Sequence, residues 1–175
     1  MPDDLDTYTW DETLKNGVPY RIRPIQADDA NRMGRLFRAC SPQTMYFRFM
    51  IPLDHMPRRL VQLFCTVDGD KEFALVAEVR PCRRRELIGA CRWMRDRDTP
   101  DTAQIMLVVA DGWTNLGAGR TLYRRIMPVA RAKGLRTMRG LILDSNLKMI
   151  SMLVNSEFRI SSHIEDDMFV FSFDL

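Results

Sequence analysis

Two glycines one residue apart stand in the segment DGWTNLGAGRTLYRRIM, residues 111–127, between an aliphatic run and a helix-like run. A turn of this kind gathers backbone N–H groups at the start of a helix, where the helix dipole also favours negative charge. Gly117 and Gly119 would leave room for phosphate oxygens, and the arginines that follow add positive charge. The segment predicts a diphosphate site. A glycine turn that only packs the helix on a sheet is the alternative interpretation.

Two other glycine codes for phosphate do not fit this segment. A Walker loop ends in Gly-Lys-Ser or Gly-Lys-Thr, whereas Arg120 and Thr121 follow the glycine here and the four-residue spacer is absent. A dinucleotide fingerprint needs a third glycine, after the first strand of a βαβ unit. Leu122 occupies that position, and the loop follows a strand in the middle of the chain.

The surrounding pattern predicts one α/β domain built around a single sheet, with an almost continuous aliphatic strand directly before the loop. Residues 1–18 read as a loosely ordered acidic lead-in, and residues 19–175 as the domain. Pro128 is expected to bend the helix after the loop, and Gly134 to end it. The expected strands are 20–25, 72–79, 86–95, 103–110, 135–143, 158–162 and 168–173; the expected helices are 26–39, 41–49, 56–67, 117–133 and 145–155.

Composition narrows the function classes. The net charge of +3 over 175 residues is too small to argue for nucleic acid. The longest aliphatic run, 105–110, is far shorter than the roughly 20 residues of a membrane span. No apolar run follows the acidic start, so we expect a cytoplasmic protein with no signal peptide. Two distant histidines argue against a metal site, and Cys40, Cys65, Cys82 and Cys91 read as reduced thiols.

A second segment, LDSNLKMISMLVNSEF at residues 143–158, strengthens the diphosphate interpretation. The two segments together resemble the acyl-CoA-dependent N-acetyltransferase (GNAT) superfamily. Its diphosphate loop, Gln/Arg-x-x-Gly-x-Gly/Ala, is matched by TNLGAG, and its Asn-x-x-Met/Ala helix begins at Asn146. The segments YRIRPIQADD, SPQTMYFRF and EFALVAEV look most like bacterial GNAT domains of the protein lysine acetyltransferase type. The resemblance covers about residues 18–173.

The resemblance implies a fold and a cofactor. It implies a mixed, mostly antiparallel sheet of about seven strands with helices on both faces. The strand at 106–109 would splay from that at 135–143, and acetyl-CoA or another acyl-CoA would lie between them, without any metal. Thr114 departs from the family's Gln or Arg, which implies weaker cofactor binding. The implied cofactor contacts are Leu107, Val108 and Val109 for the pantetheine, Asn146 for the same arm, and Thr114, Asn115, Leu116, Gly117, Ala118, Gly119 and Arg120 for the diphosphate.

At the two positions where the resemblance implies catalytic residues, this sequence has side chains that cannot accept or donate the proton. The usual glutamate base is matched by Gln104, and the usual acid that protonates the leaving thiolate is matched by Leu153. Glu78 is our first substitute for the base, with a salt-bridged glutamate as the alternative. Asp111 and Asp144 are further acids at strand ends, where loop and cap roles are the alternatives.

Two functions remain open at this point. The chain is expected to transfer an acetyl or short acyl group to a primary amine of a small molecule or a protein lysine. The alternative is a weakly active or inactive acyl-CoA-binding sensor or interaction module. Residues 40–65 would overhang the acceptor side, with Tyr46, Phe47, Arg48 and Phe49 as its lining, and Trp93 stays ambiguous. The acceptor is not identified, and a homodimer would be ordinary for this class.

Overall fold

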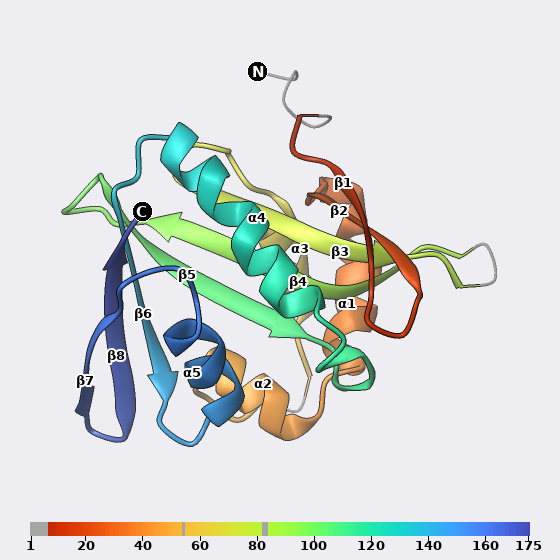
Figure 1. Cartoon of the computed structure of the whole chain (residues 1–175). Coiled ribbons are helices and arrows are strands. Elements are labelled where there is room, and N and C mark those ends of the chain that lie inside the picture. The colour runs from red at the N-terminus through yellow and green to blue at the C-terminus, as the bar shows by residue number, and fades with distance from the viewer. Residues whose placement is uncertain (1–6, 54, 82–83) are drawn as a thin grey trace.

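The computed structural model describes residues 7–53, 55–81 and 84–175, which form one eight-stranded sheet with helices on both faces (Figure 1). Its strand order is β1-β2-β3-β4-β5-β6-β8-β7. The strands are β1 (Trp10–Thr13), β2 (Pro19–Pro24), β3 (Glu72–Val79), β4 (Glu86–Arg95), β5 (Thr102–Val109), β6 (Thr137–Leu143), β7 (Ser161–Glu165) and β8 (Met168–Asp174). The helices are α1 (Ala30–Arg38), α2 (Pro42–Phe49), α3 (Arg58–Cys65), α4 (Ala118–Ala132) and α5 (Leu147–Val154), with short 3-10 turns η1 (Ala27–Asp29) and η3 (Asp111–Trp113).

The sheet is antiparallel except between β5 and β6, and this one parallel pair is short. It joins Thr102 to Thr137, Ala103 to Met138 and Gln104 to Arg139, and then stops. From there β6 continues against β8, which pairs with it along its whole length. The expected splay between these strands is therefore present. Figure 1 shows β5 and β6 separating toward the end of the sheet where α2 and α5 lie.

Two hydrophobic cores cover the two faces of the sheet. The first contains Leu122, Ile126 and Met127 of α4, together with Leu153 of α5. The second is built by α1, α2 and α3 over the opposite face. Because β3 is covered on both sides, seven of its eight residues are buried, which explains its apolar run from Phe73 to Ala77. The predicted fold class, a mixed α/β sheet that is mostly antiparallel, is confirmed.

The helix ends follow the sequence signals. The Ser41 hydroxyl accepts the N–H of Thr44 at the start of α2, with Pro42 in the first turn. Gly134 follows α4 at φ +79°, as a left-handed glycine at a helix end should. Pro128 lies inside α4, and the helix runs on past it to Ala132.

Two expectations about the strands need correction. Residues 10–18 are not a loose lead-in: β1 pairs with β2 and adds an eighth strand, and Leu14 is only 3% exposed in the first core. The first strand of the terminal hairpin begins at Ser161 rather than at residue 158. Asp166 and Asp167, with φ +47° and +61°, form its turn.

Some residues of the sequence analysis lie outside the described residues: the acidic residues of 1–6, and Cys82. The thiols of Cys40, Cys65 and Cys91 are free. In the described part of the chain, no helix combines the length and apolar composition that a membrane span requires. Within the same residues, no three side chains of His, Cys, Asp or Glu gather as metal ligands would.

Candidate acyl-CoA site

A cavity of about 1000 Å³ lies where β5 and β6 separate. Its walls are formed by helix α2, the length of β5 that is not paired with β6, the loop before α4 and the start of α5. Of the predicted cofactor contacts and the predicted base position, those that line it are Gln104, Leu107, Val108, Val109, Thr114, Asn115, Gly117, Gly119, Arg120 and Asn146. Two of the predicted cofactor contacts do not line it: Ala118 is buried, and Leu116 packs against the first core.

The loop before α4 exposes a run of unused backbone donors. Asn115 and Gly117 have φ of +62° and +100°, and the helix begins at Ala118 with no side-chain cap. No acceptor among the described residues takes the N–H groups of residues 115–120. A helix start leaves its first N–H groups without intrahelical partners, and an anion at that point satisfies them. The loop has the donors that a diphosphate site needs.

The two glycines of this loop are required for different structural reasons. Gly117 stands in the left-handed region, which other residues rarely adopt. A Cβ on Gly119 would lie 3.3 Å from Cγ2 of Val109 and 3.5 Å from Cδ2 of Leu107. The start of α4 thus packs directly on β5, so the packing alternative describes part of the role of Gly119.

Lys15 is a positively charged lining residue that the sequence analysis missed. Its backbone N–H donates to the carbonyl of Leu116 at 3.0 Å, and its side chain lines the cavity beside the loop. It was missed because residues 1–18 read as a lead-in. Lys148 and Ser151 of α5 also line the cavity, at positions of the second motif that carry no signal of their own.

The edge of β5 facing the cavity lacks a partner strand. Its pairing with β6 ends at Gln104, whereas β4 pairs with it as far as Val109. An extended ligand can add to such an edge through its own amides, as peptides add to open sheets. This is the stretch to which the resemblance assigns the pantetheine.

Asn146 caps α5 and faces the cavity. Its side-chain oxygen accepts the N–H of Met149 at 3.3 Å. Its side-chain nitrogen donates to no acceptor in the described part of the chain, so one donor remains for a ligand.

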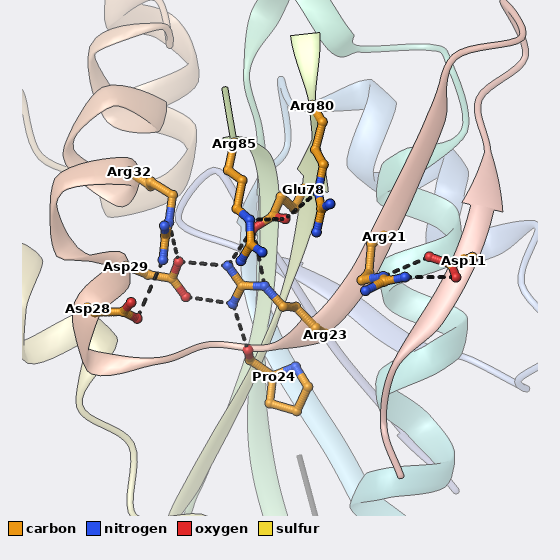
Figure 2. Close-up of polar contacts among 10 residues, drawn as sticks. All are labelled: Asp11, Arg21, Arg23, Pro24, Asp28, Asp29, Arg32, Glu78, Arg80 and Arg85. Carbon is orange, nitrogen blue, oxygen red and sulfur yellow. Dashed lines mark hydrogen bonds and ion pairs between the residues drawn. The ribbon is translucent and has the colours of Figure 1, made fainter. Parts of the chain in front are cut away.

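Glu78 is not part of this site. Its carboxylate is 1% exposed and lies 2.8 Å from Nη2 of Arg23, with Arg80 and Arg85 at 3.6 and 3.7 Å (Figure 2). Arg23 in turn holds Asp29 at 2.7 Å. Glu78 does not line the cavity. The structure therefore favours the salt-bridged alternative, and we drop Glu78 as the base.

Gln104 and Leu153, which replace the usual base and acid, differ in their surroundings. Gln104 lines the cavity and is exposed, while Leu153 is 0% exposed in the first core. Trp93 is also in that core, and Asp144 is exposed in the turn after β6, away from the cavity lining. On α2, Phe47, Arg48 and Phe49 line the cavity as expected, but Tyr46 does not.

Asp111 is the single carboxylate among the described lining residues. It accepts from the N–H of Ser41 at 2.7 Å, the Ser41 hydroxyl at 3.0 Å and the Thr44 hydroxyl at 2.9 Å. Burial acts to raise the pKa of Asp111, but the hydrogen bonds from Ser41 and Thr44 outweigh it and hold the pKa below its ordinary value. Asp111 therefore connects α2 to the loop after β5 through hydrogen bonds. Because its pKa is lowered, its carboxylate is a weak base.

The profile of the acetyltransferase (GNAT) family matches residues 36–155. An acetyltransferase of Pseudomonas aeruginosa is 26% identical over 140 residues, which cover 80% of this chain and 75% of that protein. The GNAT domain of S. lividans PAT superposes with a TM-score of 0.87 at 28% identity, covering 97% of this chain and 98% of that one.

A further solved structure shares the fold only. The cAMP-binding acyltransferase of Mycobacterium smegmatis superposes with a TM-score of 0.64 at 16% identity. The match covers 97% of this chain and 48% of that one, so the present chain spans about half the length of that protein.

Proposed function

The chain belongs to the acetyltransferase (GNAT) family, and from this premise we propose that it transfers an acetyl or other short acyl group from acyl-CoA to a primary amine. The amine belongs to a small molecule or to a protein lysine, and the likeness to the GNAT domain of S. lividans PAT supports the second. One observation carries the proposal: free N–H groups in the loop before α4, among them those of Gly117 and Gly119, border the same cavity as the open edge of β5.

The proposed cofactor pose uses both features. The diphosphate accepts from the N–H groups at the start of α4, with Lys15 and Arg120 adding positive charge. The pantetheine runs along β5 from Val109 toward Gln104, where β6 rejoins the sheet. Asn146 donates to the same arm from the opposite wall.

In the proposed reaction, the lone pair of the amine attacks the thioester carbonyl carbon. The C–N bond forms, the C–S bond breaks, and CoA leaves as the thiolate. The amine loses its proton to water, and the thiolate takes a proton from water. No His, Cys, Tyr or Glu is among the described residues that line the cavity, so holding the two reactants together is the main contribution of this chain.

A second function has a specific observation in its favour. Gln104 cannot accept a proton, Leu153 is buried, and the Asp111 carboxylate is occupied by α2. These features suit an acyl-CoA-binding sensor. Release of free thiol in the presence of amines and lysine peptides separates the two: transferase activity consumes acyl-CoA faster than buffer does, whereas a sensor binds it without consuming it.

Two finer assignments belong to the same proposal. We place the protein in the cytoplasm, and we treat residues 19–175 as the acyl-CoA-binding domain, with β1 added to its sheet. A homodimer remains our expectation for its assembly. Sedimentation of the purified chain would test it.

Binding of acetyl-CoA tests the proposal by thermal unfolding. A ligand at 100 times its dissociation constant adds about 2.7 kcal/mol to the free energy of unfolding. We expect a clear rise in Tm for the native protein and none for Gly119→Asp, which brings a carboxylate to the diphosphate donors.

Two controls separate charge from packing. Gly119→Ala adds only the Cβ, 3.3 Å from Val109, and should retain part of the shift. Gly112→Asp puts the same charge in the same segment, where a Cβ meets nothing within 4 Å, and should retain all of it. No shift at millimolar acetyl-CoA, or an unchanged shift in Gly119→Asp, would contradict the proposed site.

A further inference from the structure

Arg48 of α2 is a cation without a counter-charge at the wall of the cavity. Its side chain makes no ion pair or hydrogen bond with any described residue. The guanidinium carbon lies 4.7 Å from the ring centre of Phe49 and 5.9 Å from that of Phe64. Aromatic faces attract a cation, but they supply neither an acceptor nor a negative charge.

Arg92 of β4 brings a second guanidinium to the same place. It is 7% exposed, and its guanidinium carbon lies 5.1 Å from the ring centre of Phe64. It pairs with Glu72, and its Nε has no acceptor among the described residues. Burial, and after it the charge of Arg92, lower the pKa of Arg48 to about 10, which leaves Arg48 charged at neutral pH. One positive charge therefore stays without a counter-charge on a half-buried side chain, which an arriving anion would stabilise.

The carboxylate of the cavity does not neutralise Arg48. Asp111 is engaged by Ser41, the N-cap of α2, and by Thr44, one turn before Arg48 on that helix. The remaining charged residues of the lining, Lys15, Arg120 and Lys148, are cations. Any anion that Arg48 binds must therefore come with a ligand.

The position of these arginines coincides with the acyl end of the proposed pose. Arg92 is the register partner of Met106 on β5. Met106, Val108 and Arg48 line both the main cavity and a second cavity of about 20 Å³, which Arg92 also lines. A pantetheine that follows β5 from Val109 must end before Gln104, because β6 closes against the strand there. Its acyl group would then lie beside Met106.

We propose that Arg48, supported by Arg92, binds a carboxylate at the far end of the acyl group, so that the preferred donor is the CoA thioester of a short dicarboxylic acid. This inference rests on the proposed acyl-CoA site and names the donor that the site prefers. The second cavity has room for about one water molecule, so the carboxylate would contact Arg48 from the main cavity.

Succinyl-CoA and butyryl-CoA give a matched test, because their acyl chains have equal length and differ by a terminal carboxylate or methyl group. We expect calorimetric titration to show succinyl-CoA binding about 10-fold or more tightly, as a hydrogen bond between charged groups warrants. Malonyl-CoA and glutaryl-CoA would then report the length that places the carboxylate best.

Variants test whether Arg48 causes the preference for succinyl-CoA over butyryl-CoA. Arg48→Gln should bring the ratio of the two dissociation constants close to one, and Arg48→Lys should restore part of it, since lysine keeps the charge without the planar fork. Arg58→Gln removes an exposed arginine from α3, outside the cavity lining, and should keep the full ratio. Thermal unfolding without ligand checks that each variant is folded.

The outcomes are distinct. Equal affinity for the two thioesters in the native protein overturns this inference and leaves the acyl-CoA site standing. A preference that survives Arg48→Gln also overturns it. Failure of both thioesters to bind removes the proposed site and, with it, this inference.

Discussion

The side-chain amide of Gln104 is exposed and lines the cavity at the position where the family resemblance implies a glutamate base. An amine with a pKa of about 10.4 is neutral in roughly one molecule in 2500 at pH 7. Without a base in the cavity, we expect the rate of thiol release with a lysine peptide to rise about tenfold per pH unit from pH 7 to 9. A plateau well below the pKa of the amine would reveal a base that this account lacks.

Gln104→Glu should restore a base. We expect turnover at pH 7 to rise by up to about 100-fold, the lower range for a positioned general base. Gln43→Glu adds a carboxylate to the same cavity from α2 and serves as the matched control, with little change expected. Equal gains in both variants would show that charge alone, not position, accounts for the effect.

Glu78 contributes to stability rather than to chemistry. Glu78→Gln leaves the buried Arg23 with Asp29 as its remaining carboxylate partner in the described part of the chain, and breaking a buried pair costs about 3 kcal/mol. Urea unfolding should show that loss, with the affinity for acetyl-CoA unchanged. Glu157→Gln, at an exposed glutamate, should stay within about 0.5 kcal/mol. A loss of turnover with a lysine peptide in Glu78→Gln, while the protein is still folded, would show that Glu78 acts as the base.

The sequence could propose Glu78 as a base but could not place it. Its partner Arg23 is 55 residues away and meets it only through the pairing of β2 with β3. The glycine loop, by contrast, is local: its spacing, its left-handed glycine and the helix that follows are all readable from neighbouring residues. The local geometry of the loop was predictable, whereas a charge balance set by tertiary packing was not.

Among the elements, α2 depends on a connection to the loop after β5. Ser41 caps the helix by accepting from Thr44 and also donates to Asp111. Ser41→Ala should lower the free energy of unfolding by about 1 kcal/mol or slightly more, because a cap and a hydrogen bond to a carboxylate are both lost. Denaturant titration measures this loss, and Ser151→Ala, at an exposed serine within α5, is the control. Equal values for the two variants would contradict the connection.

Strand β1 shows why some elements escaped sequence analysis. It has four residues, Trp10–Thr13, with half of them exposed, so its pattern is short and weak. Pairing with β2 stabilises it, together with the ion pair of Asp11 and Arg21 at 2.7 Å. The divergence of β5 from β6 was predicted only through the family resemblance, because pairing between residues 35 positions apart, such as Thr102 and Thr137, leaves no periodic signal.

At the scale of the whole molecule, two carboxylates link stability to pH. Burial acts to raise the pKa of Asp29, but Arg23, the N–H of Gln26 and Arg32 outweigh it and lower that pKa below 3.8; the pKa of Asp111 is also lowered. The unfolded chain then binds protons before the folded one does, so stability falls as the pH drops below about 4.

We therefore expect urea unfolding to give similar free energies at pH 7 and pH 5 and a clear decrease at pH 3. Asp29→Asn should be less stable at pH 7 and should lose less on going to pH 3. A steep loss already between pH 7 and pH 5 would show that other groups control the acid response.

The central claim is that backbone N–H groups at the start of α4 bind the diphosphate of CoA. The most direct measurement is a crystal structure of the protein with acetyl-CoA. We predict diphosphate oxygens within hydrogen-bond distance of N–H groups in residues 115–120 and the pantetheine along β5. A bound acetyl-CoA whose diphosphate lies elsewhere, with that loop empty, would contradict the account.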